Sequence, residues 1–516
     1  MNKSMNNCGH RALPIGRFAG VLTMTGWGLT ALLVACAPVG PTYQPPRPEL
    51  PATWSGPSTP PNSRPNGVEK LGQWWTLFND PRLDSLIQRA IAANPDLKIA
   101  KARIIQARAQ YRLTTAAAAP TMGVSGAYTN SRLSENTGSS NAGTSQDLFQ
   151  TGFDAGWEID IFGGARRAAE AAEARLTAAG ENSTEVLVSL EAEVARNYLE
   201  LRGSQQRLAT ARQNLAGQEK TLELDRGRRE IGIGNELEVA QAESQLAVTN
   251  AQLPPLENSI GQSIYRLSLL LGLSPLSLSE ELLAVTPLPT LPAQLPATLP
   301  SELLRRRPDI RRAERQLAAA TADIGVATAE LSPRFSLTGL TGLQSTNLSD
   351  LLSTGSRYWT VGPTVRWPLF DGGRTRANIT LNQGRQEEAQ AAYEKTVLTA
   401  LHEVEAALLA QARGEETRRT LAAAVTAGER TVKLASGRYR AGLTAFLDVL
   451  LGERLLYQSQ DQLVQSEQQL AVNLVALCKA LGGGWDIGQD QNKTPEKMTA
   501  KTVVSSQATP SGDMNK

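Results

Sequence analysis

The chain has 516 residues, a net charge of +2 at pH 7 and an aromatic content of 5%. The near balance of 52 basic and 50 acidic residues gives no indication of a nucleic-acid or acidic partner. Three cysteines and two histidines are too few for a disulfide framework or a metal cluster. Abundant Ala, Leu, Gln, Glu and Arg instead favour long helices over a β-sandwich.

Residues 1–35 are predicted to be a lipoprotein signal peptide. Basic residues precede the apolar stretch 18–34, which ends in Leu-Val-Ala directly before Cys36. Cleavage there leaves Cys36 as the acylated mature N-terminus, and this covalent lipid is the only cofactor-like group that we expect. Ala37, in place of Asp, permits sorting of the lipoprotein to the bacterial outer membrane. The alternative to a cleaved signal peptide is a membrane helix that stays attached. Residues 36–72 follow as an extended, proline-rich, lipidated tether.

Residues 73–274 are predicted to form the first of two structural repeats. A tryptophan-rich start precedes an amphipathic helix, which Asn94-Pro95 breaks, and a second helix ends near Pro120. Alternating apolar and polar residues then predict strands, and proline-free heptads predict unusually long helices. The expected bounds are 121–131 and 148–162 for the strands and 163–231 and 236–272 for the long helices, with a kink at Pro254-Pro255.

The strand expected at 148–162 has one charged side and one apolar side. Asp154, Glu158 and Asp160 alternate with apolar residues, and Arg366 has the same relation to its neighbours further along the chain. This alternation is typical of a transmembrane barrel strand whose polar side lines the lumen. A solvated face of an ordinary half-buried strand has the same pattern and stays open as an alternative.

The pattern returns roughly 210 positions later. The segment Gly-Trp-Glu-Ile-Asp-Ile-Phe-Gly-Gly-Ala-Arg at 156–166 corresponds to Thr-Val-Arg-Trp-Pro-Leu-Phe-Asp-Gly-Gly-Arg at 364–374. A proline-rich linker at 275–300 therefore joins the first repeat to a second, at 301–484. The expected elements of the second repeat are strands at 334–344 and 357–370 and long helices at 374–440 and 445–482, followed by a polar tail at 485–516 that is predicted to be disordered.

Helix length and strand number together predict an oligomeric tube. Roughly 65 residues of helix span about 100 Å at about 1.5 Å per residue. Four strands cannot close a barrel, because an open edge in lipid leaves backbone groups unpaired and the smallest outer-membrane barrels have about eight strands. At least two chains must share one barrel, and their helices must form one bundle. From the helices alone, a soluble coiled-coil rod remains the alternative.

The order of motifs resembles the TolC-like outer-membrane efflux factors, in their lipoprotein (OprM/NodT-type) branch. The matching motifs are Cys36 with Val-Gly-Pro-Thr-Tyr at 39–43, Trp-Trp at 74–75, Asn-Pro at 94–95, Arg-Arg-Arg-Pro-Asp-Ile-Arg at 305–311, Phe-Asp-Gly-Gly-Arg at 370–374 and Leu-Gly-Gly-Gly-Trp at 481–485. The resemblance implies a homotrimer with a twelve-stranded membrane β-barrel and a periplasmic α-helical barrel. It also implies two partners, a periplasmic adaptor (membrane fusion) protein and an inner-membrane RND-type pump.

The same resemblance implies a gate at the periplasmic tip of the second helix pair. Leu447 and Asp448 match that region, with Tyr439 and Arg454 nearby. Leu451 stands where the family usually has a second Asp, so one acidic ring is replaced by an apolar one. Asp448 also follows a turn, where a carboxylate favours the start of a helix whatever its other role. Leu447 and Leu451 also fit ordinary residues of the heptad seam, an interpretation that is favoured for Leu447.

A passive conduit, not an enzyme, is the function that these features predict. The mature chain keeps one histidine, His402, and contains neither a phosphate-binding glycine loop nor a catalytic triad. We expect an exit duct of a tripartite efflux pump, with drugs, solvents and metal ions all conceivable as cargo. Two alternatives stay open: the same fold serving type I protein export, and a structural coiled-coil lipoprotein that does not conduct.

Overall fold

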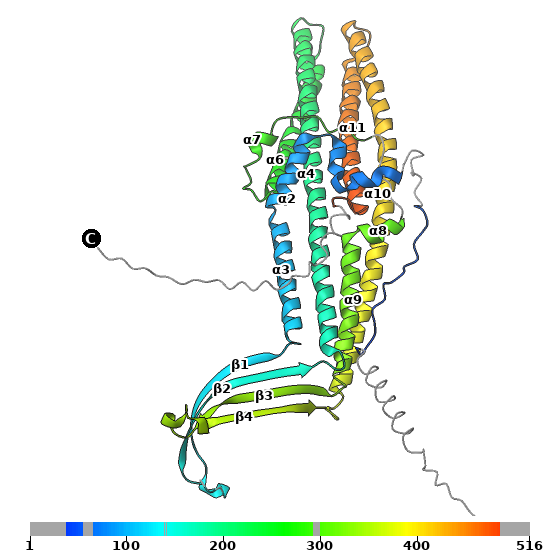
Figure 1. Ribbon diagram of the computed structural model, residues 1–516. Coiled ribbons are helices and arrows are strands. Elements are labelled where there is room, and N and C mark those ends of the chain that lie inside the picture. The colour runs from blue at the N-terminus through cyan, green and yellow to red at the C-terminus, as the bar shows by residue number, and fades with distance from the viewer. Residues whose placement is uncertain (1–37, 55–64, 139, 141, 293–299, 486–516) are drawn as a thin grey trace, which may run out of the picture.

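The protein is an elongated molecule in which helical hairpins extend from one end of a four-stranded sheet (Figure 1). The computed structural model describes residues 38–54, 65–138, 140, 142–292 and 300–485. The expected signal peptide, the lipidation residue Cys36 and the polar tail after residue 485 lie outside these residues. The fold confirms the predicted class, two tandem repeats in which long helices for an α-helical barrel join four strands for a shared membrane β-barrel.

The first repeat contains the elements from the N-terminal 3₁₀-helix to the end of the first hairpin. They are η1 (Pro65–Phe78), α2 (Pro81–Ala93), α3 (Pro95–Ala116), β1 (Thr121–Arg132), β2 (Ser145–Ile159), α4 (Gly164–Glu230), α5 (Glu236–Asn250) and α6 (Leu253–Leu270). The side chain of Asp80 caps α2 by accepting hydrogen bonds from two backbone N–H groups, and Asn94 caps α3 by accepting one. Both helices begin with proline, which suits a first position because its missing N–H would have no partner there.

The second repeat follows the short helix α7 (Ser279–Leu282) and has the same order. Its elements are α8 (Pro300–Arg306), α9 (Pro308–Ala329), β3 (Arg334–Ser345), β4 (Arg357–Arg366), α10 (Arg374–Arg440) and α11 (Phe446–Ala480), with the 3₁₀ turns η3 (Leu348–Asp350) and η4 (Thr354–Ser356) between its strands. The 3₁₀ turn η2 (Glu135–Thr137) lies between the two strands of the first repeat. The long helices α4 and α10 have 67 residues each. None of the described helices has the length and hydropathy needed to cross a membrane.

Two tryptophans occupy equivalent places in the repeats. The indole N–H of Trp157 donates to the carbonyl of Ala118, and that of Trp367 donates to the carbonyl of Leu331, both at 3.0 Å. Each carbonyl lies just beyond the helix that leads into the first strand of its repeat, α3 or α9. The structural duplication therefore extends to individual side-chain contacts between the strands and the helices.

The predicted tether and linker each contain a helix in the structure, so less of each segment is extended than expected. The sequence predicts an extended chain to residue 72, but η1 begins at Pro65, and Leu71 and Trp74 are buried in the core. The proline-rich linker at 275–300 contains α7, because Leu278 and Leu282 are also buried. Burial of apolar side chains outweighs the local preference of these proline-rich segments for an extended chain.

Three predicted element bounds are also corrected. The helix expected over 236–272 is two helices, since α5 ends at Asn250 and α6 begins at Leu253, directly before two prolines that have no N–H to continue the ladder. The strand expected to reach residue 162 ends at Ile159, and the strand expected to reach residue 370 ends at Arg366.

The sheet has strand order β1-β2-β3-β4, and every neighbouring pair is antiparallel. Residues directly opposite each other share a face, so the register divides the side chains into two sets. One face contains the large apolar residues Met122, Val124, Phe153, Trp157, Ile159, Leu337, Trp359, Val361 and Val365, each at least 38% exposed. The other face is mainly glycine, serine, threonine and charged residues.

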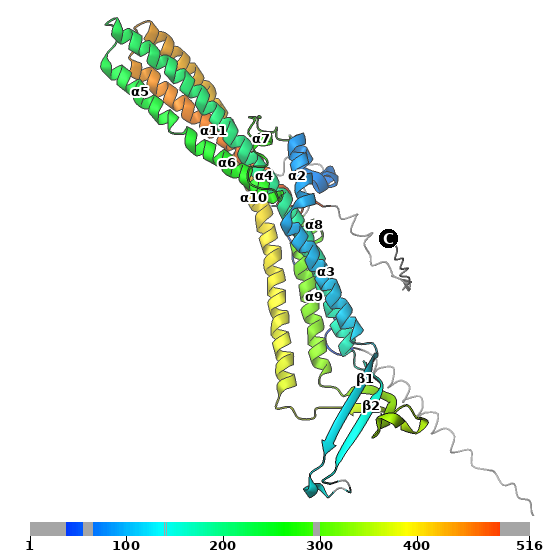
Figure 2. The same ribbon diagram turned by 90° about the vertical axis from the view of Figure 1, so that its left-hand side faces the viewer.

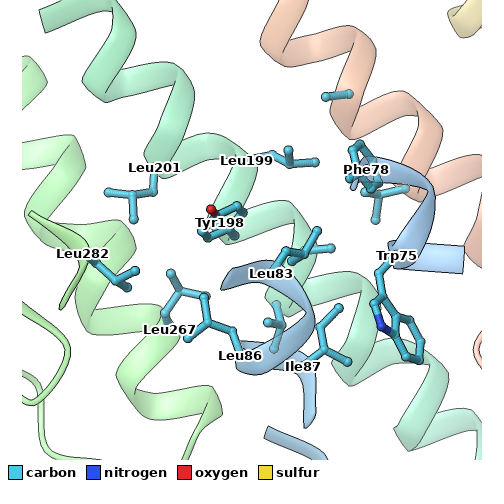
Figure 3. Close-up of a cluster of buried hydrophobic side chains, with 14 of the residues drawn as sticks. Trp75, Phe78, Leu83, Leu86, Ile87, Tyr198, Leu199, Leu201, Leu267 and Leu282 are labelled. Carbon is cyan, nitrogen blue, oxygen red and sulfur yellow. The ribbon is translucent and has the colours of Figure 1, made fainter. Parts of the chain in front are cut away.

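An apolar core joins the two repeats near the middle of the long helices (Figure 3). Leu83, Leu86 and Ile87 of α2 pack with Tyr198 and Leu199 of α4, and side chains of α6, α7 and α11 complete the same cluster. Complete burial of one such side chain contributes about 1.5–3 kcal/mol. This core fixes both hairpins to the body of the molecule at the level of α2.

Candidate functional site

Three of the four predicted lumen residues lie on the polar face of the sheet. Asp154 and Glu158 are on β2, Arg366 ends β4, and all three side chains are exposed. Asp154 is paired with Gly123 on one side, and Glu158 is paired with Ser336 on the other. Asp154 also lies opposite Leu340 on β3, but both charged side chains are exposed and face open space.

Asp160, the fourth predicted lumen residue, has a different role. It lies one residue beyond β2, and its carboxylate accepts hydrogen bonds from the backbone N–H of Arg166 at 2.9 Å and from the guanidinium of the same residue at 3.3 Å. Asp371 similarly accepts a hydrogen bond from the backbone N–H of Thr375 at the start of α10, at 2.8 Å. Asp160 therefore holds the turn between a strand and a long helix, where a carboxylate also favours the positive helix end.

Both outer edges of the sheet are free in the described part of the chain. β1 pairs only with β2, and β4 pairs only with β3. Free edges expose a row of backbone N–H and C=O groups, which cannot remain unpaired in lipid. The apolar face and the two free edges together describe one segment of a closed membrane barrel.

Arg167, near the start of α4, binds the first described residues of the chain. Its guanidinium donates to the carbonyls of Val39 at 3.1 Å and Gly40 at 3.3 Å, and it pairs with Glu170 at 2.8 Å. Gly40 has φ +88°, and a Cβ there would lie 2.5 Å from the Cα of Gly325 on α9. The segment that follows the predicted lipidation residue is thus fixed at the junction of sheet and helices.

Tyr439, at the far end of α10, connects the two hairpins at their tips. Its hydroxyl donates to Asp225 Oδ1 of α4 at 2.9 Å and lies 3.4 Å from Glu238 Oε2 of α5. The guanidinium of Arg228 lies 4.6 Å from the ring centroid, and the ring of Phe446 lies 5.5 Å away. Burial raises the pKa of Asp225 and, with the neighbouring carboxylate of Asp225, that of Tyr439.

The other predicted gate residues lie around this contact without joining it. Leu447 and Leu451 are 48% and 47% exposed, and the side chain of Arg454 is also exposed. Asp448 lies in the first turn of α11 and accepts a hydrogen bond from the hydroxyl of Thr444. No side chain caps the start of α11, so this contact does not distinguish the helix-start interpretation of Asp448 from a gating role. Leu447 and Leu451 do not belong to the apolar cluster at the tip.

Sequence reasoning missed buried polar residues on α4 and α11 near the hairpin tips. Glu453 is 7% exposed and accepts a hydrogen bond from the hydroxyl of Thr221 at 3.5 Å, while Gln218 and Asp225 are 3% and 1% exposed. Burial raises the pKa of Glu453, and the negative charge of Asp225 adds to this rise. A signal was present, because Gln218 and Asp225 each follow a heptad leucine of α4 by three positions, where a coiled coil normally has apolar residues.

Comparison with known proteins agrees with the resemblance inferred from the motifs. The family model for outer membrane efflux proteins matches residues 86–273 and 299–483. Outer membrane protein OprJ of Pseudomonas aeruginosa is 33% identical over 475 residues, which are 90% of this chain and 97% of that protein. Nodulation protein T of Rhizobium leguminosarum bv. trifolii is 32% identical over 465 residues, which are 88% of this chain and 96% of that protein.

Structural comparison leads to the same family. The solved structure of the outer-membrane channel OprN has a TM-score of 0.83 and 36% identity, and the match covers 87% of this chain and 100% of that one. The two segments matched by the family model lie in the first and the second repeat. The chain belongs to the outer membrane efflux protein family.

Proposed function

We propose that this protein is the exit duct of a tripartite efflux pump, a homotrimer that passively conducts small molecules across the periplasm and the outer membrane. The observation that supports this most directly is the sheet, which has one apolar face, one polar face and two free edges. It lies at the end of helices of 67 residues, about 100 Å at about 1.5 Å per residue.

The free edges require other copies of the chain. If β1 of one copy pairs with β4 of the next, three copies form a barrel of twelve strands, above the minimum of about eight that outer-membrane barrels need. The apolar face then contacts lipid, and Asp154, Glu158 and Arg366 line a water-filled lumen. Because α3 leads into β1 and α10 follows β4, neighbouring copies also place these helices side by side in one tunnel.

A lipid on Cys36 supplies the membrane anchor in this proposal. Pro38, two residues later, already contacts the protein, since a Cβ on Gly163 would lie 2.5 Å from the Cβ of Pro38. The acyl chains must therefore insert close to the junction between β2 and α4. Cys36→Ser should abolish incorporation of labelled fatty acid, and incorporation into that variant would contradict the assignment.

The gate is proposed at the tip, around Leu447, Asp448 and Leu451, with Tyr439 and Arg454 beside them. The contact of Tyr439 with Asp225 holds the second hairpin against the first. Breaking this contact would let α10 and α11 move outwards and widen the tunnel. Energy for that movement comes from outside the chain, from a periplasmic adaptor protein and an inner-membrane RND-type pump.

The proposal is tested by retention of dyes, antibiotics and metal ions in cells that lack the gene and carry plasmid copies. Wild-type protein should lower retention of at least one cargo class. Val361→Asp puts a charge on the apolar face, where charged residues destabilise a strand that contacts lipid, and should fail. The matched variant Thr360→Asp changes the neighbouring residue on the polar face and should function.

Each outcome separates the duct from its alternatives. A non-conducting lipoprotein predicts equal retention with and without the wild-type gene. A protein export duct predicts unchanged small-molecule retention together with loss of specific secreted proteins from the medium. Equal failure of both Asp variants would contradict the assignment of the two sheet faces.

A further inference from the structure

The contact between α4 and α11, here called the seam, changes its chemistry along its length. The two helices run antiparallel from the hairpin tips to the core, as both views of the molecule show (Figures 1 and 2). Near the core, Val194, Ala195 and Leu199 of α4 belong to the same apolar cluster as Ala471 and Leu474 of α11. These five side chains are fully buried and belong to the main apolar cluster, although α4 also buries polar residues such as Asn197 and Ser204 in the same stretch.

The upper part of the seam contains polar contacts, which lie between the ion pair described below and an apolar cluster at the tips that includes Leu222, Phe446 and Val449. Thr221 and Glu453 share a hydrogen bond, and Gly217 of α4 faces the hydroxyl of Tyr457. Among the described residues, Gln218 has no protein partner for either atom of its side-chain amide, and Asp225 has none for Oδ2. A buried polar atom without a hydrogen-bond partner destabilises the closed contact, and hydration of that atom on opening removes this cost.

One ion pair lies between these two parts. The guanidinium of Arg207 donates two hydrogen bonds to the carboxylate of Asp461, Nε to Oδ1 at 2.7 Å and a terminal nitrogen to Oδ2 at 3.1 Å. Its two side chains are 28% and 37% exposed, so the pair is partly shielded from water. Paired, parallel hydrogen bonds of this kind are directional and resist relative displacement of the two helices. Directly below, Gln468 packs against Gly203, where any Cβ would lie 2.2 Å from its Oε1.

We propose that Arg207 and Asp461 are positioning residues that set the lower limit of the gate. When the second hairpin moves outwards, α11 separates from α4 between the tip and this ion pair. On the core side of the pair, the two helices stay in contact. The proposal rests on the gate described above and adds which length of α11 moves. Two observations support it: the bidentate pair joins α4 to α11 at this level, and on the core side of the pair both helices contribute to the main apolar cluster.

The distinction can be measured by cysteine labelling at two buried positions of α11. Glu453→Cys reports on the upper seam and Ala471→Cys on the lower seam, since the two residues are 7% and 0% exposed and lie on either side of Asp461. The native Cys478 is a silent background, because burial raises its pKa to about 12. Labelling with a water-soluble maleimide is compared in full-length protein in cells, with Tyr439 intact and with Tyr439→Phe.

The expected result is selective exposure. Tyr439→Phe leaves Asp225 without its donor and should raise labelling at position 453 about tenfold, while position 471 stays unlabelled. Labelling at 471 with the ion pair intact would place the limit elsewhere and overturn the proposal. Leak of a large antibiotic is measured in the same cells, so absence of leak with Tyr439→Phe would overturn the gate itself, and the proposed limit with it.

The ion pair is then tested by breaking and restoring it. Asp461→Asn, combined with Tyr439→Phe, should expose position 471 to the reagent. Reversing the pair, with Arg207→Asp and Asp461→Arg together, should protect position 471 again, which a loss of folding would not. If position 471 stays protected in the leaking Asp461→Asn protein, the ion pair is not the limit.

Discussion

The two hairpins have outgoing helices of equal length but different returning helices. In the first, α5 and α6 are separated at Ala251-Gln252, and α6 then packs into the apolar core. In the second, α11 is one uninterrupted helix of 35 residues that runs from the tip into that core. A broken helix follows the body of the molecule closely, whereas a continuous helix can swing outwards at the tip while its other end stays fixed in the core. The first hairpin is therefore suited to a fixed frame and the second to a moving element.

The proposed difference between the hairpins requires that α11 be continuous. Gln462 is an exposed position in the middle of α11, and Gln462→Pro removes a backbone hydrogen bond at a cost of about 3 kcal/mol or more. We expect loss of efflux with protein still present in the membrane. Gln462→Ala is the matched control and should behave as wild type. Normal efflux by the proline variant, measured as dye retention, would contradict the proposed role of α11.

The reverse substitution concerns the first hairpin. Pro254 lies in the first turn of α6, where its missing N–H has no partner, so Pro254→Ala should change the free energy of unfolding by less than about 1 kcal/mol. Efflux should be unchanged. Together, the two substitutions show whether only one of the returning helices must be stiff.

Much of this architecture is predictable from the sequence because it depends on periodicity. Heptads predict the long helices, alternation predicts the strands, and repetition at a fixed spacing predicts the order of the elements. For most elements the predicted bounds agree with the structure to within a few residues. The errors occur where tertiary burial decides, as at η1 and α7, where Leu71 and Leu282 enter the core. Local composition contains no information about a distant apolar partner.

The contacts of the candidate gate could be predicted only in part. Tyr439 was recognisable by its resemblance to the family, but its partner Asp225 is 214 positions away, and no local pattern pairs them. Arg167 and Val39 are likewise separated by 128 positions. The polar residues at heptad positions of α4, Asn197, Ser204, Gln218 and Asp225, were the available signal. All four are buried, so they are polar residues at positions where a heptad helix normally buries apolar ones.

The second-largest effect is expected from breaking the hydrogen bond between Tyr439 and Asp225, which holds the two hairpins together. Tyr439→Phe removes the donor to a buried carboxylate and should weaken the closed tip by about 1–3 kcal/mol. We expect greater sensitivity to large antibiotics that normally cannot cross the outer membrane. Tyr393→Phe makes the same chemical change in a buried tyrosine of a separate apolar cluster and should leave sensitivity unchanged. Equal sensitivity of the two variants would argue against a gate at the tip.

A smaller effect should appear as pH dependence of the leak. Burial raises the pKa of Asp225 and Glu453 above their ordinary values of 3.8 and 4.5. Asp225 faces Tyr439, Glu238 and Arg228, and Glu453 faces Thr221 and Asp225, so acidic groups predominate at this contact.

The sign follows from which form binds protons more tightly. The closed form does, because opening hydrates both carboxyl groups and returns their pKa to the ordinary range. The closed form is therefore most stable below the ordinary values, and it loses stability as pH rises through the raised ones. Conductance of the reconstituted channel should increase with pH across that window. Glu453→Gln should flatten the increase, and an unchanged profile would show that other groups control it.

The smallest effect is expected on the frame itself. Arg226 of α4 pairs with Glu243 of α5 at 2.6 Å, but their side chains are 53% and 49% exposed. Such solvent-exposed pairs contribute about 0–1 kcal/mol, because water screens the charges and ordering two long side chains costs entropy. Arg226→Ala should therefore leave both leak and thermal stability close to wild type, even though the residue lies at the same height as Tyr439. A leak as large as that of Tyr439→Phe would mean that the first hairpin moves too, and that the division into a fixed frame and a moving element is wrong.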